Sequence, residues 1–175
     1  MTASEVFESV TGSGSSDFAL LVSILRRHSP WCLIGGLAVN CYVEPVFTLD
    51  ADIVVVVGQL ESIKNDLAGA GFSLQEFPHS LNATMPGSRL RIQLSLDPRY
   101  QEFLKDTNER EVLGEQVSVA SLINVARGKI WAWSDEARRP TKRKKDELDL
   151  MRLLEAYPEL RGVMPRDIRE QVPEA

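Results

Sequence analysis

Residues 34–57 read IGGLAVNCYVEPVFTLDADIVVVV, and this stretch decides the fold of the chain. A Gly-Gly pair follows the apolar run at residues 31–34, and two aspartates lead into a run of β-branched residues. Apolar, β-branched runs bounded by glycine are typical of buried strands. The stretch therefore predicts a strand, a glycine turn, a short helix, a loop and an acidic strand, in that order.

The two aspartates, Asp50 and Asp52, predict a metal site. Side chains at positions i and i+2 of a strand point to the same face, roughly 6–7 Å apart. Two unpaired carboxylates at the mouth of an apolar strand repel each other and raise each other's pKa, and a divalent cation relieves that repulsion. Mg²⁺ suits such ligands, because it takes one or two carboxylates and completes its shell with water and substrate phosphates. In the alternative interpretation, Asp50 only caps neighbouring backbone N–H groups.

The glycine pair, Gly35 and Gly36, predicts an anion-binding turn next to that metal site. Glycine lets the backbone approach a ligand closely, and the N–H groups at the start of the following helix favour an anion. A phosphate-binding turn and a metal site are thus predicted to face each other.

The motif Gly35-Gly36 with Thr48-x-Asp50-x-Asp52 resembles the signature of the polymerase-beta-like nucleotidyltransferase superfamily. More narrowly, it is similar to small bacterial nucleotidyltransferase-fold proteins of the abortive-infection toxin type. The resemblance implies the nucleotidyltransferase fold. It also implies that Gly35 and Gly36, with Thr48, contact the triphosphate of a bound nucleotide, while Asp50 and Asp52 hold Mg²⁺ for in-line attack on the α-phosphate.

The resemblance extends to the C-terminal third of the chain, through Lys129 and an Arg-x-Lys-Asp-x-x-Asp pattern at residues 143–149. It implies that Lys129, Arg143 and Lys145 neutralise a triphosphate, for which both lysine and arginine are suitable donors. Asp146 and Asp149 lie three residues apart on one helical face and would orient those cations or support the site. The alternative for this acidic pair is salt bridging with basic residues of the same helix.

Two positions depart from the superfamily pattern. In its catalytic members a neighbouring strand contributes a third carboxylate, and the alternation in residues 89–96 places Gln93 there. Three alternatives follow: the third acid is not used, Asp97 at the strand end substitutes for it, or the protein binds nucleotide without efficient transfer. Relatives often carry an arginine two residues before the threonine of the motif, where this chain has Val46.

The composition fits one soluble domain. The chain has 175 residues, of which 43% are hydrophobic and 26% charged, as in ordinary globular proteins. Residues 1–16 end in a Gly- and Ser-rich segment and are expected to be flexible, and residues 17–175 to form a single nucleotidyltransferase-like domain. Cys32 and Cys41 lie in apolar surroundings and predict reduced thiols in a cytoplasmic protein. We expect neither a signal peptide nor membrane association, because no suitable apolar run is visible.

Charge is unevenly distributed. The net charge is −5, yet residues 138–145 contain six of the twenty basic residues and no acid. Such a basic segment binds phosphate or an acidic partner, or it is a solvated helix start.

Periodicity assigns the remaining elements, and Asp17 is the candidate N-cap of the first helix. We expect an α/β protein with a mixed sheet of about four or five strands, flanked by helices and closed by a helical C-terminal section. Further helices are predicted at residues 59–69, 122–133 and 141–156, strands at 72–77 and 89–96, a hairpin at 109–119, and turns at 78–88.

Together these features predict a metal-dependent nucleotidyltransferase, which moves a nucleoside monophosphate from a nucleoside triphosphate to an acceptor hydroxyl of RNA, protein or a small molecule. Gln93 favours an alternative, a non-catalytic nucleotidyltransferase-fold protein that acts through a cognate protein partner, for example in a bacterial toxin–antitoxin pair. A third possibility is a scaffold whose basic segment docks an acidic surface. His28 and His79 share no motif with cysteine or serine, so neither a zinc site nor a Ser-His-Asp hydrolase is predicted.

Overall fold

The described residues begin shortly before the helix at residues 14–25. The computed structural model describes Phe7 and residues 11–174, so most of the segment expected to be flexible lies outside it. Helix α2 (Gly14–Leu25) begins three residues before the predicted cap, Asp17. Ser13 is the N-cap instead, because the backbone N–H of Asp17 already donates to the Ser13 carbonyl at 2.8 Å, as in the helix interior.

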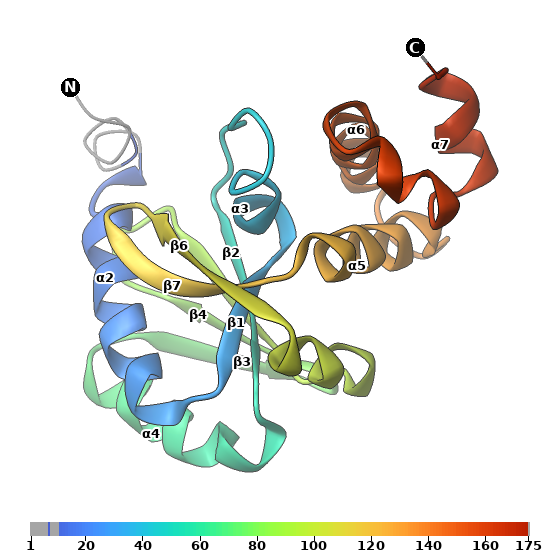
Figure 1. Cartoon of the computed structure of the whole chain (residues 1–175). Coiled ribbons are helices and arrows are strands. Elements are labelled where there is room, and N and C mark those ends of the chain that lie inside the picture. The colour runs from blue at the N-terminus through green and yellow to red at the C-terminus, as the bar shows by residue number, and fades with distance from the viewer. Residues whose placement is uncertain (1–6, 8–10, 175) are drawn as a thin grey trace.

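A single mixed sheet of seven strands forms the centre of the molecule (Figure 1), in the order β3-β4-β5-β2-β1-β7-β6. Strand β1 is antiparallel to β2, while the β2–β5 and β1–β7 pairs are parallel. The strands are β1 (Trp31–Ile34), β2 (Asp50–Val55), β3 (Ser73–Phe77), β4 (Ser80–Thr84), β5 (Arg91–Ser95), β6 (Thr107–Val112) and β7 (Glu115–Ala120).

The prediction of about four or five strands is therefore wrong. Strand β4 lies in the segment expected to be all turn, where Leu81 and Ala83 are fully buried and alternate with the half-buried Asn82. The predicted hairpin, now β6 and β7, also joins the same sheet, because β7 pairs with β1. Strand β7 gains its partner β1 from a distant part of the chain, whereas β4 pairs with its sequence neighbours β3 and β5. Local turn composition reveals neither pairing.

The helices divide into two groups (Figure 1). Helices α2 and α4 (Leu60–Gly69) contact each other at one side of the sheet, whereas α5 (Leu122–Ser134), α6 (Pro140–Ala156) and α7 (Arg166–Gln171) gather at the other end. The predicted helical C-terminal section is present. Helix α3 (Gly35–Val39) and the 3₁₀ helix η3 (Pro98–Lys105) connect strands near the centre, and shorter 3₁₀ turns are η1 (Arg26–His28), η2 (Val57–Gln59) and η4 (Pro158–Gly162).

The two cysteines form no disulfide with each other. Cys32 and Cys41 are both free thiols, and burial raises the pKa of Cys32 to about 12 and that of Cys41 to about 11. Within residues 11–174, no helix has the length and apolar character needed to cross a membrane.

Candidate functional site

The glycine turn and the acidic strand meet at the end of β1. Ile34, the last residue of β1, pairs with Asp52 of β2, so the chain enters α3 directly beside that carboxylate. Gly35 has a positive φ of 71°, and a Cβ at this position would lie 2.9 Å from the Cβ of Asp52. Only glycine fits both the left-handed backbone and the close approach.

Gly35→Ala is expected to lower the free energy of unfolding by about 1–2 kcal/mol, the cost of a left-handed alanine, with a further loss from the contact with Asp52. Chemical denaturation measures this change. Gly58→Ala is the matched control, since Gly58 has no positive φ and a Cβ there would meet nothing within 4 Å. Equal stability of the two variants would contradict the tight fit described here.

A cavity of about 260 Å³ opens beside this turn. Its sheet side is formed by the glycine pair, Thr48 and the two aspartates, and its helix side by residues of α5 and α6. Of the predicted site residues, those that line it are Gly35, Gly36, Thr48, Asp50, Asp52, Gln93, Lys129, Lys145 and Asp146. The fold therefore brings the two separate parts of the sequence pattern to one place.

Asp50 lies between two basic side chains. Its carboxylate accepts from Arg91 Nε at 2.6 Å and from Lys142 Nζ at 2.7 Å. Burial acts to raise the pKa of Asp50, but these two partners outweigh it and lower that pKa below its usual value. The prediction that repulsion raises the pKa of both aspartates is thus wrong for Asp50. The capping alternative also fails to describe it, because within the described part of the chain its carboxylate accepts from side chains and from no backbone N–H group.

Asp52 has a different environment. Its carboxylate accepts no hydrogen bond from residues 11–174, and burial raises its pKa, with Lys129 opposing and Asp50 adding to the shift. A desolvated carboxylate without a donor is a suitable ligand for a hard cation. Among the described residues, no group of three or more His, Cys, Asp or Glu side chains is placed to hold a metal ion. A two-carboxylate site fits Mg²⁺ when water and substrate phosphates complete the coordination shell.

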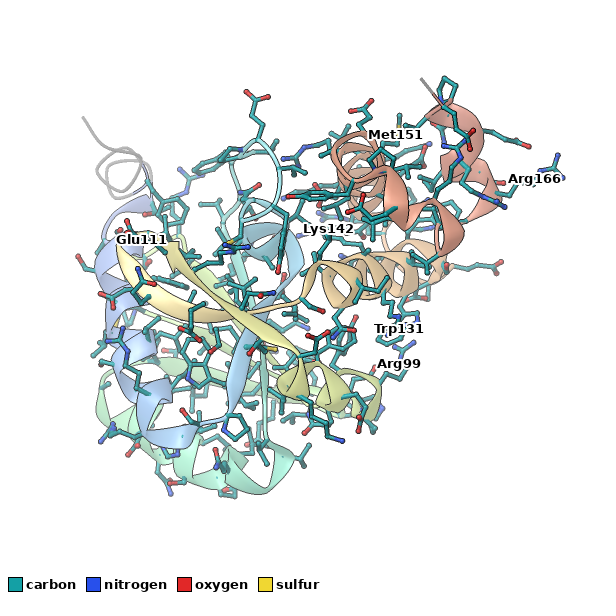
Figure 2. All side chains as sticks on the ribbon, in the orientation of Figure 1. Arg99, Glu111, Trp131, Lys142, Met151 and Arg166 are labelled. Carbon is teal, nitrogen blue, oxygen red and sulfur yellow. The ribbon has the colours of Figure 1, made fainter. Side chains whose placement is uncertain are left out.

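Lys142 belongs to α6 (Figure 2), and its Nζ donates to Asp50 Oδ2 of β2 at 2.7 Å, where it would compete with a bound cation. Lys142→Met is expected to raise the affinity for Mn²⁺, a probe for Mg²⁺, about two- to fivefold without nucleotide, because the partly exposed ion pair with Asp50 no longer competes. Titration followed by electron paramagnetic resonance measures free Mn²⁺. Lys144→Met, which removes an exposed lysine of the same helix, should change nothing. Unchanged Mn²⁺ affinity in the Lys142 variant would show that the pair does not compete.

A buried chain of charges joins α5 to α6. Lys129 Nζ lies 2.9 Å from Asp146 and 2.7 Å from Asp149, and all three side chains are at most 8% exposed. Arg138 and Arg152 bind the outer oxygens of the two acids at 2.6 and 2.8 Å. Burial lowers the pKa of Lys129, but Asp149 and Asp146 raise it more, so the lysine stays charged. Among the described residues, Asp149 forms the same-helix salt bridge of the alternative interpretation, with Arg152, whereas Asp146 pairs with Arg138, which precedes α6. Both acids also contact Lys129.

Three of the predicted site residues lie outside the lining of the cavity. Arg143 donates to the backbone carbonyl of Trp133 at 2.9 Å. Asp97 caps η3 and pairs with Arg99, so it does not replace the missing third acid. Asp149 is buried in the charge chain described above.

Sequence reasoning missed several lining residues. Arg138 and Lys142 line the cavity and belong to the basic segment at residues 138–145. The concentration of positive charge in that segment was the sequence feature that could have identified them. Tyr100 also lines the cavity and packs edge-on against Trp131, with ring centroids 5.3 Å apart. Figure 2 shows Trp131 beside Arg99, whose guanidinium lies 5.3 Å from the indole ring. Ser95 and Asn124 carried no sequence signal that could have identified them.

Comparisons with known proteins identify the fold. No protein-family model matches the sequence, and no curated protein is significantly similar to it. Among solved structures, ANT(2")-Ia in complex with adenylyl-2"-tobramycin matches with a TM-score of 0.63 at 13% identity, over 91% of this chain and 98% of that one. The lincomycin-bound lincosamide antibiotic adenylyltransferase LnuA matches with a TM-score of 0.54 at 13% identity, over 78% and 92%. An antigenic nucleotidyltransferase-like protein from Paracoccidioides brasiliensis matches with a TM-score of 0.53 at 16% identity, over 78% and 74%. The chain thus has the nucleotidyltransferase fold.

Proposed function

We propose that this protein is a metal-dependent nucleotidyltransferase, which transfers a nucleoside monophosphate from a nucleoside triphosphate to an acceptor hydroxyl. One observation carries the proposal: a single cavity joins the glycine turn and the paired carboxylates on one side with Lys129, Lys142 and Lys145 on the other. Solved structures of the same fold include an adenylyltransferase and a complex with an adenylylated antibiotic.

The side chains divide the work of binding a triphosphate. Gly35 and Gly36 let the phosphates approach the backbone, while Lys142 and Lys145 neutralise their charge. Lys145 already points toward the sheet side of the cavity, because its Nζ donates to the Thr48 hydroxyl at 3.3 Å. Asp50 and Asp52 would hold Mg²⁺, which when bound supplies charge neutralisation at the transferred phosphoryl group.

Calorimetric titration tests the proposal directly. The purified chain would be titrated with ATP, GTP, CTP and UTP, each with and without Mg²⁺. We expect selective binding of at least one nucleotide that depends on Mg²⁺, and the preferred nucleotide names the donor. If the folded protein binds none of the four, the proposed function is wrong.

A second candidate is a non-catalytic protein of the same fold that works through a cognate protein partner. It is favoured by the register, which places the neutral Gln93 directly beside Asp52, where a third carboxylate would lie. A bacterial toxin–antitoxin role in the cytoplasm and a toxin-type ancestry belong to this proposal. Mg²⁺-dependent nucleotide binding without transfer to any acceptor would support it.

The docking of an acidic surface by the basic segment is less well supported. Arg138, Lys142 and Lys145 line the cavity, and Arg143 is bound to the backbone of α5. Neutralising Arg143 and Lys145 together separates the two readings, because loss of nucleotide affinity indicates a phosphate site and loss of partner binding alone indicates docking.

A further inference from the structure

A second hollow lies on the open face of the sheet, next to the first. It encloses about 310 Å³ and is lined by residues of β2, β3, β4 and β5. Asp50, Asp52 and Gln93 line both hollows, so the two cavities meet at the paired carboxylates. Any ligand in the second hollow would therefore lie directly beside the proposed site of phosphoryl chemistry.

The strand register builds the floor of this hollow. Gln93 pairs with Asp52, Asn82 pairs with Gln93, and Gln75 pairs with Asn82. Paired residues of neighbouring strands point to the same face, so these four side chains form one row across four strands. Strands lie about 4.7–4.9 Å apart, and the row therefore extends about 14 Å from Asp52, long enough to hold a nucleoside or a disaccharide.

The opposite face of these strands is part of the core. Ala51 and Ala83 alternate with the residues of the row and are fully buried. The polar row thus lies on the solvent-facing side of a sheet that is covered on one face only. The residues of the row are not needed for core packing, so their side chains can bind a ligand.

The charges of the hollow restrict what it can bind. Among the described residues that line it, the only acids are Asp50 and Asp52, and the only base is Arg91, which pairs with Asp50 at 2.6 Å. A polycation would find no further carboxylates, and an anion would find no free cation. The other polar groups are amides and hydroxyls, which recognise hydroxyl groups by hydrogen bonds.

Asn82 offers a vacant hydrogen-bond acceptor. Its Oδ1 atom is buried and accepts no hydrogen bond from the residues that the structure describes. Buried polar atoms are nearly always paired, and an unpaired one calls for a missing partner. A hydroxyl group of a ligand in this hollow would supply it.

We propose that the second hollow binds the acceptor, and that the acceptor is a small, uncharged, polyhydroxylated molecule such as a sugar or a nucleoside. This inference rests on the proposed function. With the triphosphate in the first hollow, the acceptor hydroxyl approaches the α-phosphorus from the other side, as in-line displacement requires. Its oxygen forms the new bond to that phosphorus, the bond to the bridging oxygen breaks, pyrophosphate leaves with the electron pair, and the hydroxyl proton passes to solvent.

Side-chain amide resonances in ¹⁵N-labelled protein test the inference without any transfer. The full chain would be titrated with sucrose, uridine and tobramycin, which represent a sugar, a nucleoside and a polycation. We expect saturable shifts of the Gln75, Asn82 and Gln93 amides with sucrose or uridine, and which one acts identifies the source. Gln75→Leu should weaken this binding about fivefold, the loss of one hydrogen bond. The control is Gln116→Leu, at an exposed glutamine of β7 far along the same sheet.

The outcomes separate this inference from the proposed function. If Mg²⁺-dependent nucleotide binding is present but neither neutral probe shifts these amides, or only tobramycin does, the acceptor assignment is wrong and the nucleotidyltransferase proposal stands. If a neutral probe binds at the three amides but no nucleotide binds, the hollow is a hydroxyl-binding site and the donor half of the proposal fails.

Discussion

The combined change Asp50→Asn and Asp52→Asn is expected to lower Mg²⁺-dependent affinity for the preferred nucleoside triphosphate by more than about a hundredfold. Removing only the outer partner of a metal ligand typically costs about ten- to a hundredfold, and here both proposed ligands themselves lose their charge. Transfer, once the acceptor is identified, should fall by about a thousandfold or more. Calorimetry with and without Mg²⁺ measures the first effect.

The fold should survive this double substitution. Asparagine is nearly isosteric with aspartate, and the partners that Asp50 loses, Arg91 and Lys142, have side chains that are 59% and 34% exposed and can rehydrate. Asp97→Asn provides the control, because Asp97 lies at the end of the neighbouring strand but outside the cavity. Full Mg²⁺-dependent binding in the double variant, or equal losses in the control, would contradict the assignment of the metal site.

Lys129→Met is expected to lower the free energy of unfolding by about 3 kcal/mol, the low end of the cost of removing one partner from a buried ion pair. Asp146 and Asp149 would keep only Arg138 and Arg152 as partners, although both acids are at most 4% exposed. Urea denaturation with an unchanged m-value measures the loss.

A double-mutant cycle identifies the cause of that loss. Adding Asp149→Asn to Lys129→Met should recover part of the stability, because the uncompensated charge disappears with the acid. Lys144→Met is the matched lysine control, since its side chain is 78% exposed and the change should stay within about 0.5 kcal/mol. A Lys129 variant as stable as this control would mean that the charge chain is not a structural element.

Much of the sheet side of the site was predictable from the sequence. Alternation within a strand fixed the shared face of Asp50 and Asp52, and the same rule placed Gln93, which the register sets directly beside Asp52. The helix side was less predictable. Lys142 lines the cavity and Arg143 does not, because one residue turns a helix by about 100°, and packing of α6 decides which basic residue faces inward.

Strand β4 was missed for a related reason. Residues 78–88 contain Pro, Gly, Asn and Ser, the usual signals of a turn. Leu81, Ala83 and Met85 do alternate with polar residues, but this short run lies between turn residues, which outweighed it in the prediction. The pairing of β4 with both β3 and β5 supplies the hydrogen bonds that make it one.

The position of β1 between β2 and β7 has a consequence for how the chain acquires its structure during synthesis. The four strands β3, β4, β5 and β2 can pair with one another and with β1 once residue 95 has been made. The other edge of β1 must wait for β7, whose Val119 pairs with Leu33 at a sequence separation of 119 − 33 = 86. Closing such a long loop is slow compared with forming hairpins. A nascent chain therefore displays the apolar edge of residues 31–34 to the cell until the ribosome has passed residue 120, and that interval is when aggregation or chaperone capture competes with folding.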